Sequence, residues 1–130
     1  MNLDARVEEL KKRFREALEL LEKGDAVQAS EKLYKVAENA VKILSEMNRI
    51  PEYEKARQKG TWWTRLLDKA AKRLGDIYGK EVLDAWTTAY ELHQKGFHEE
   101  QLTREDALER AYKVEDLIKI VEREIKGKRC

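Results

Sequence analysis

The only two histidines of the chain, His93 and His98, lie five residues apart and are followed by Glu99 and Glu100. Imidazole and carboxylate groups can together bind a metal ion or serve in general acid–base chemistry. Two ligating histidines on one helix face are normally three or four residues apart, and here Gly96 lies between them. A metal site of His93, His98 and Glu99, as in a small metal-dependent hydrolase, is therefore the less favoured interpretation.

The favoured interpretation of the same segment is structural. Gly96 predicts the left-handed residue that follows a helix end, with Phe97 contacting Leu92 across the turn. Thr103 and Asp106 then predict a capping box at the start of the next helix. On this interpretation the histidines belong to a connection between two helices.

A second candidate site combines adjacent tryptophans with a basic segment. Adjacent residues of a helix point about 100° apart, so we expect Trp63 in the core and Trp62 at its edge or outside. Residues 55–73 contain seven basic residues and one acidic residue, whereas residues 76–109 contain three basic and nine acidic residues. The candidate ligand-binding or nucleic-acid-binding residues are Trp62, Arg65, Lys69, Lys72, Arg73 and Lys59.

Three uses of this basic segment remain open at the level of sequence. Basic side chains beside an aromatic ring could bind a nucleotide or RNA, by phosphate contacts and base stacking. The charge asymmetry could instead join two copies of the chain, or the chain and a protein partner. It could also be only a solvated helix face.

No catalytic residue is predicted. The sequence lacks a phosphate-binding loop, a dinucleotide-binding fingerprint, a Cys-x-x-Cys pair and a nucleophile elbow. Its two serines, Ser30 and Ser45, fall within one predicted helix, and its single cysteine is Cys130. We therefore expect no cofactor and favour a non-enzymatic binding or interaction module. A protein-binding scaffold of the helical-repeat type is an alternative, although no second repeat is visible.

The composition predicts charged helices around an apolar core. The chain has 130 residues, of which 42% are hydrophobic and 41% are charged, and its formal net charge is +1. Such a charge content with few amide side chains is typical of heat-adapted proteins. A balanced charge gives no global attraction to nucleic acid or membrane, and no apolar run is long enough to span a bilayer. The single cysteine favours a cytoplasmic location.

Apolar residues that recur every three or four positions predict an all-α bundle of about five antiparallel helices. One domain is expected over residues 1–126, with a flexible tail over residues 127–130. The first two helices are expected to be joined by Gly24, with Asp25 capping the second.

The remaining helices are expected after residue 60. Residues 49–60, which include the only proline, are expected to form a loop. Thr61 is expected to cap the third helix and Gly79 to end it, and the fifth helix is expected to begin near Thr103. No strand is predicted.

Two stretches of the sequence resemble the PaREP family of small archaeal proteins. They are G-D-x-x-x-A-x-E-K-L-Y-K, from Gly24 to Lys35, and L-H-x-x-G-F-H-E, from Leu92 to Glu99. The resemblance implies an archaeal protein with an up-and-down bundle similar to HEPN domains, which often dimerise and bind nucleotides or cleave RNA. It therefore implies a homodimer. The nuclease members of that wider group have an arginine four to six residues before a histidine, and this sequence has none there, so ribonuclease activity is not implied.

Overall fold

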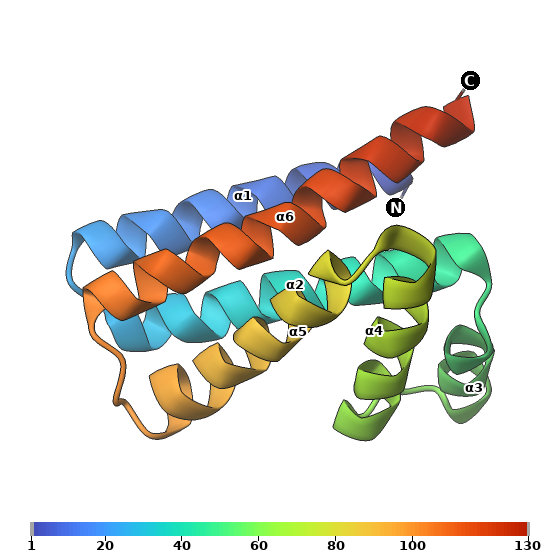
Figure 1. Ribbon diagram of the computed structural model, residues 1–130. Helices are drawn as coiled ribbons and strands as arrows, with labels where there is room; N and C mark the ends of the chain where they lie inside the picture. The colour runs from blue at the N-terminus through green and yellow to red at the C-terminus, as the bar shows by residue number, and fades with distance from the viewer. Residues whose placement is uncertain (1, 130) are drawn as a thin grey trace.

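The computed structural model describes residues 2–129, and this range contains helices but no strand. Figure 1 shows α1 and α5 running in one direction and α2 and α6 in the other. The predicted all-α bundle is confirmed, but it has six α-helices and a π-helical segment in place of five helices. In chain order the elements are α1 (Leu3–Glu22), α2 (Ala26–Asn48), α3 (Pro51–Lys59), α4 (Thr64–Tyr78), α5 (Glu81–Glu91), η1 (Leu92–His98) and α6 (Arg104–Arg129).

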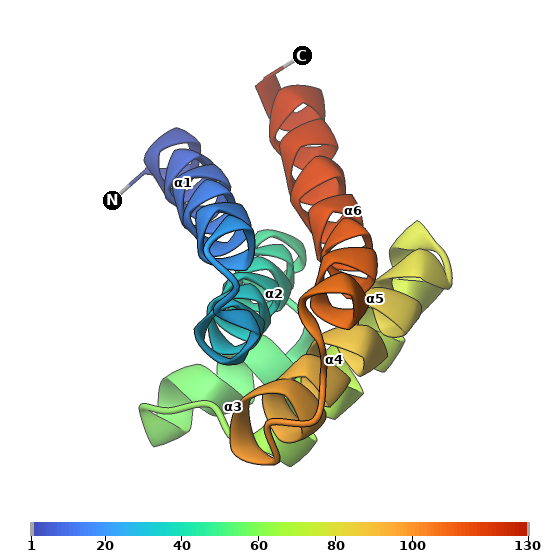
Figure 2. The same cartoon turned by 90° about the vertical axis from the view of Figure 1, so that its left-hand side faces the viewer.

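Helix α2 is the centre of the molecule, because it contacts every other helical element. Figure 2, which looks along the long helices, shows α2 between the α1/α6 pair and the layer formed by α3, α4 and α5. A helix surrounded in this way must be apolar on more than one face. Accordingly, the fully buried residues of α2 include Leu33, Val36, Ala37, Val41 and Leu44.

The turn between α1 and α2 follows the predicted chemistry. Gly24 has a φ of 86°, a left-handed conformation that glycine adopts without steric cost. The amide of Asp25 donates to the carbonyl of Leu20 at 2.8 Å, which closes the end of α1. The Asp25 carboxylate accepts from the amide of Gln28 at 3.0 Å and so caps α2. Because this connection is short, α1 and α2 lie antiparallel against each other.

The expected loop over residues 49–60 is wrong, since residues 51–59 form helix α3. Pro51 occupies the first helical turn, where its missing N–H costs nothing. Gly60 ends the helix with a φ of 75°. Only Glu52 and Ala56 of α3 are buried, so this helix lacks the apolar stripe by which helices are recognised in a sequence.

The start of α4 also differs from the prediction. Thr61 does not cap the helix, because its hydroxyl donates to the carbonyl of Trp62 at 3.2 Å and α4 begins at Thr64. The two tryptophans therefore precede the helix, with Trp63 in extended backbone, and exchange their expected places. Trp62 is half-buried against the core, whereas the side chain of Trp63 is exposed.

The predicted helix end at Gly96 is wrong as well. The chain continues through Leu92–His98 as the π-helix η1. Gly96 is buried, and a Cβ atom at this position would collide with the side chain of Ser30 on α2. Glycine is required here by the close approach of two helices and not by a left-handed turn.

The start of α6 agrees with the predicted capping box. The hydroxyl of Thr103 accepts from the amide of Asp106 at 3.0 Å, and the Asp106 carboxylate accepts from the amide of Thr103 at 3.1 Å. Helix α6 extends to Arg129, so residues 127–129 of the expected tail are helical, and Cys130 lies outside the described residues. Within the described part of the chain, no helix combines the length and the apolar character needed to cross a membrane.

Candidate functional site

The structure brings the two histidines together. The Nε2 atoms of His93 and His98 are 3.2 Å apart, and their rings are nearly perpendicular at 82°. In an α-helix, residues five apart would point about 140° away from each other. In a π-helix the hydrogen bonds join residues five apart, so η1 places His98 over His93. The wider π-helical turn therefore brings the two histidine side chains together, which their five-residue spacing in an α-helix would not do.

A carboxylate from another helix orients the first of these rings. Oε1 of Glu31 on α2 lies 2.7 Å from Nδ1 of His93. A carboxylate only accepts hydrogen bonds, so Nδ1 of His93 carries a hydrogen. In neutral His93 the Nε2 atom then presents a lone pair, and the 3.2 Å contact is a hydrogen bond from Nε2–H of His98. Glu31, His93 and His98 form a hydrogen-bonded chain, which we call the Glu31–His93–His98 chain.

Aromatic rings pack around His93 and restrict its movement. The ring of Tyr34 stacks on His93 with centroids 4.3 Å apart and planes 24° apart. Tyr90 and Phe97 lie further out, with centroids 5.9 and 6.4 Å from that of His93. Burial, together with the negative charges of Glu38 and Glu31, raises the pKa of Tyr34 above its usual range. Tyr34 therefore remains a neutral packing partner at physiological pH.

The predicted carboxylate partner of the histidines was Glu99, whereas the carboxylate that contacts His93 is that of Glu31. Among residues 2–129, no three His, Cys, Asp or Glu side chains are placed to hold one metal ion. Sequence reasoning missed Glu31 because it lies 62 residues from His93. The available signal was its position three residues before Tyr34, which places both side chains on one face of α2.

The basic candidate residues fall into two groups. Arg73 is not available as a free cation, because it donates to Glu52 of α3 at 2.8 and 3.2 Å. Trp62 packs against the core. The remaining candidates are exposed, and the exposed tryptophan of this segment is Trp63 in place of Trp62. We call this set the α3–α4 basic surface, and it consists of Lys59, Trp63, Arg65, Lys69 and Lys72.

Asp68, the single acidic residue within the basic segment, lies three residues from Arg65 and four from Lys72, and so shares their side of α4. Its Oδ1 accepts a hydrogen bond from Nε1 of buried Trp86 on α5 at 2.7 Å. This neutral donor does not remove the charge of the carboxylate. The α3–α4 basic surface keeps an excess positive charge, because Lys59, Arg65, Lys69 and Lys72 outnumber this one acid.

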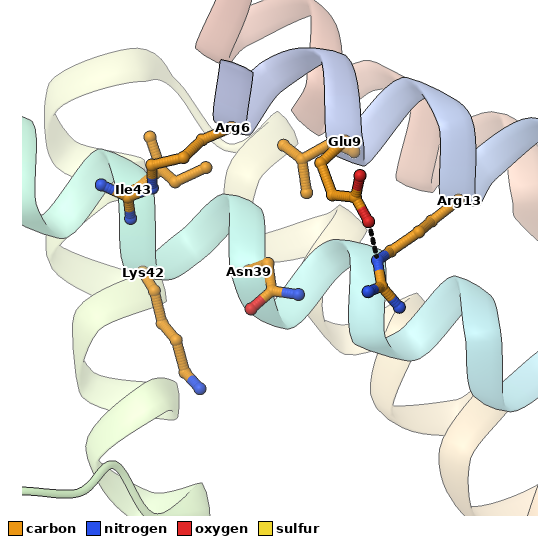
Figure 3. A pocket seen from close by; sticks show the side chains of 7 residues that line it. Arg6, Glu9, Arg13, Asn39, Lys42 and Ile43 are labelled. Atoms are coloured by element: carbon orange, nitrogen blue, oxygen red, sulfur yellow. Dashed lines mark hydrogen bonds and ion pairs between the residues drawn. The ribbon is translucent and has the colours of Figure 1, made fainter. Parts of the chain in front are cut away.

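A groove between α1 and α2 was not predicted from the sequence. It has a volume of about 200 Å³ and is lined by Arg6, Glu9, Leu10, Arg13, Asn39, Lys42 and Ile43. Figure 3 shows the ion pair between Arg13 and Glu9 on the α1 side of the groove. The other two cations also have carboxylate partners, since Arg6 pairs with Glu46 at 3.0 Å and Lys42 with Glu38 at 3.1 Å. The charges of this groove are therefore compensated within the chain.

Comparison with known protein families gives a match to the archaeal PaREP1/PaREP8 family over residues 5–118. The chain belongs to this family. A crystal structure of a Sulfolobus solfataricus protein is similar to the PaREP1/PaREP8 chain, with a TM-score of 0.82 and 34% sequence identity over 89% of this chain and 95% of that one. A solution structure of the same structural-genomics target has a TM-score of 0.79 and 34% identity, and covers 90% of this chain and 91% of that chain. A comparison with curated proteins gives no match.

The PaREP resemblance seen in the sequence is thereby confirmed, and the structure adds a spatial relation. The first of the two stretches that carry the resemblance holds Glu31 and Tyr34, and the second holds His93 and His98. These stretches, on α2 and η1, pack against each other in this PaREP1/PaREP8 member. The relation of the family to HEPN domains remains a prediction.

Proposed function

We propose that this protein is a non-enzymatic binding module that holds the phosphate groups of RNA on its α3–α4 basic surface. The observation that carries the proposal is the lack of compensation there. Arg65, Lys69 and Lys72 lie on one exposed face of α4. None of them lies within 4.0 Å of a carboxylate of the described residues, and Lys69 acts on Glu52 only as a more distant charge. The cations of such a face are available to bind an anionic ligand.

Several cations on α1 and α2 have carboxylate partners, as in the pairs of Arg6 with Glu46 and Lys32 with Glu16. By contrast, Arg65 and Lys69 are like charges four residues apart, an arrangement that destabilises a helix by about 0.2–0.5 kcal/mol. A bound phosphate between them would remove this repulsion.

Two further features suit a nucleic acid. Trp63 is 37% exposed beside Arg65, where it can stack on an unpaired base. Trp63 is also the N-cap residue of α4, and its side chain makes no capping hydrogen bond. The first amides of α4 can thus donate to a phosphate at the positive end of the helix dipole.

RNA binding is tested with the full chain and a fluorescently labelled single-stranded RNA. With about three phosphates contacted, affinity should fall about 20-fold between roughly 50 and 200 mM salt. The double variant Arg65→Ala, Lys69→Ala should bind more weakly and with a shallower salt dependence. The matched control is Lys119→Ala, Arg123→Ala, an exposed pair with the same spacing on α6. Equal losses in both double variants, or binding that does not respond to salt, would contradict the proposal.

A protein partner or a second copy of the chain is the competing occupant of this surface, since acidic residues predominate over residues 76–109. Sedimentation velocity, together with the RNA-binding measurement, distinguishes a homodimer interface from an RNA-binding surface. A dimer that dissociates in the Arg65→Ala, Lys69→Ala variant and shows no RNA binding would assign the surface to a homodimer. The homodimer and the cytoplasmic location remain predictions.

A further inference from the structure

We propose that His93 and His98 form a binding site for a divalent late first-row transition ion, of which Zn²⁺ is the test case. The two Nε2 atoms are the protein ligands, and Glu31 orients the first imidazole. This site lies on α2 and η1, away from the α3–α4 basic surface, and does not depend on RNA binding.

The separation of the ligand atoms fits one ion. Zinc binds imidazole nitrogen at about 2.0–2.1 Å, so two nitrogens at a tetrahedral angle are roughly 3.3 Å apart. The Nε2 atoms of His93 and His98 are 3.2 Å apart. In the absence of metal, one hydrogen lies between these atoms. For Nε2 of neutral His98 to bind an ion, this hydrogen moves to Nδ1 of the same ring, so the imidazole stays neutral and no net proton is released.

The first ligand has the environment of a metal-binding histidine. Such a residue almost always donates its other ring N–H to a carboxylate or carbonyl, which fixes the tautomer and increases the basicity of the ligand. His93 does this through the 2.7 Å contact of its Nδ1 with Glu31. Both side chains are 21% exposed, so the contact is shielded but the ion is still accessible from solvent.

The packing fixes one ligand and leaves the other adaptable. The ring of Tyr34 on α2 stacks on the ring of His93 on η1 and restricts its orientation. His98 is exposed and is the last residue of η1, so its ring can rotate to direct a lone pair at the ion. The π-helical turn itself is a common feature of functional sites, because it realigns side chains that an α-helix would separate.

The described residues supply two ligands and not three. Water would therefore complete the coordination, as at sites that keep open positions. Such a site exchanges its ion readily and contributes little to folding, in contrast to closed structural zinc sites. The ligand type favours Zn²⁺, Cu²⁺ or Ni²⁺ over Mg²⁺ or Ca²⁺, which prefer oxygen.

The test is calorimetric titration of the full chain with zinc chloride. We expect one ion per chain, and a loss of affinity of at least about 10-fold in His98→Ala, since one of two ligands is removed. Glu31→Gln should cost about 10- to 100-fold, the usual effect of removing an orienting carboxylate. Glu99→Gln is the matched control and should bind as the wild type, because this neighbouring carboxylate is not required.

His98 is the residue to substitute, because its exposed side chain can be removed without disturbing the core, and circular dichroism should show an unchanged fold. A second measurement is the ¹⁵N shift of the histidine rings, in which zinc should move both Nε2 resonances. No saturable binding by the wild type up to about 1 mM zinc would overturn the proposal. Unchanged affinity in His98→Ala would overturn it as well.

Discussion

Glu52 of α3 accepts two hydrogen bonds from the guanidinium group of Arg73 on α4, at 2.8 and 3.2 Å. Glu52 is 8% exposed and belongs to the shortest α-helix of the described residues. The hydrogen bonds from Arg73, with its positive charge, lower the pKa of Glu52. This ion pair attaches α3, which has little apolar surface to bury, to the rest of the molecule.

Substitution of this carboxylate should reduce the stability of the protein. Glu52→Gln is expected to lower the free energy of unfolding by about 1–2 kcal/mol, because a charge-assisted hydrogen bond is replaced by a weaker one. Urea denaturation measures the change. Glu54→Gln removes two solvent-accessible ion pairs of the same carboxylate, with Arg57 and Arg49, and should cost less than about 0.5 kcal/mol.

The same pair gives the stability a defined pH dependence. Since the pKa of Glu52 is lower in the folded than in the unfolded protein, its stabilising contribution is complete at neutral pH. It is lost as the pH falls below about 4.5 and the carboxylate becomes protonated. The difference in stability between the wild type and Glu52→Gln should therefore decrease between pH 5 and pH 3. A constant difference would mean that charge is not its source.

Gly96 should tolerate no side chain. Gly96→Ala places a Cβ atom against Ser30, and the resulting displacement of η1 from α2 should cost about 1–3 kcal/mol. The thermal unfolding midpoint reports this loss. Gly127→Ala is a suitable control, since open space surrounds that glycine within α6 and the substitution should be neutral or slightly stabilising. Equal effects of the two substitutions would contradict the close packing.

Substitution of Ser30, in contrast to that of Gly96, should not destabilise the protein. Its hydroxyl is buried and has no hydrogen-bond partner among the described residues. Removal of an unsatisfied polar atom of this kind is neutral or favourable, so Ser30→Ala should leave the free energy of unfolding unchanged or raise it by up to about 1 kcal/mol. A clear loss of stability in urea denaturation would show that the hydroxyl has a partner in solution.

Substitutions of the two tryptophans should have different effects on the stability of the protein and on its affinity for RNA. Trp62 packs against the core, so Trp62→Ala should lower the free energy of unfolding by about 2–4 kcal/mol. Trp63→Ala should cost less stability than Trp62→Ala, because Trp63 is the more exposed of the two side chains. If RNA stacks on Trp63, the same substitution should weaken its binding by about 1–3 kcal/mol. Urea denaturation and fluorescence anisotropy with labelled RNA measure the two quantities.

Sequence periodicity predicted the long helices well, because each buries an apolar stripe and has clear capping residues. The apolar stripe that includes Leu10 and Phe14 predicted α1, and both residues are buried in that helix. The reciprocal hydrogen bonds of Thr103 and Asp106 cap the start of α6, as predicted. Helix α3 was missed because recognition relied on apolar periodicity. Its proline at the start and glycine at the end were sufficient local signals.

The candidate site could be predicted only in part. The sequence singled out His93 and His98, but an α-helical spacing rule cannot describe a π-helical turn. Glu31 comes from a distant part of the chain, and only the packing of α2 against η1 brings it to His93. The exchange of Trp62 and Trp63 has a similar origin, since the 100° rule applies to helical residues and both precede α4.

The position of α6 has a consequence for synthesis on the ribosome. Helix α6 packs on both α1 and α2, although residues 23–103 separate it from α1 in the sequence. At about 5–20 residues per second, translation from the end of α2 to the start of α6 takes roughly 3–11 seconds. During that interval the apolar sides of the first two helices remain uncovered in the nascent protein. We expect this hairpin to be the segment that a chaperone binds before release of the polypeptide.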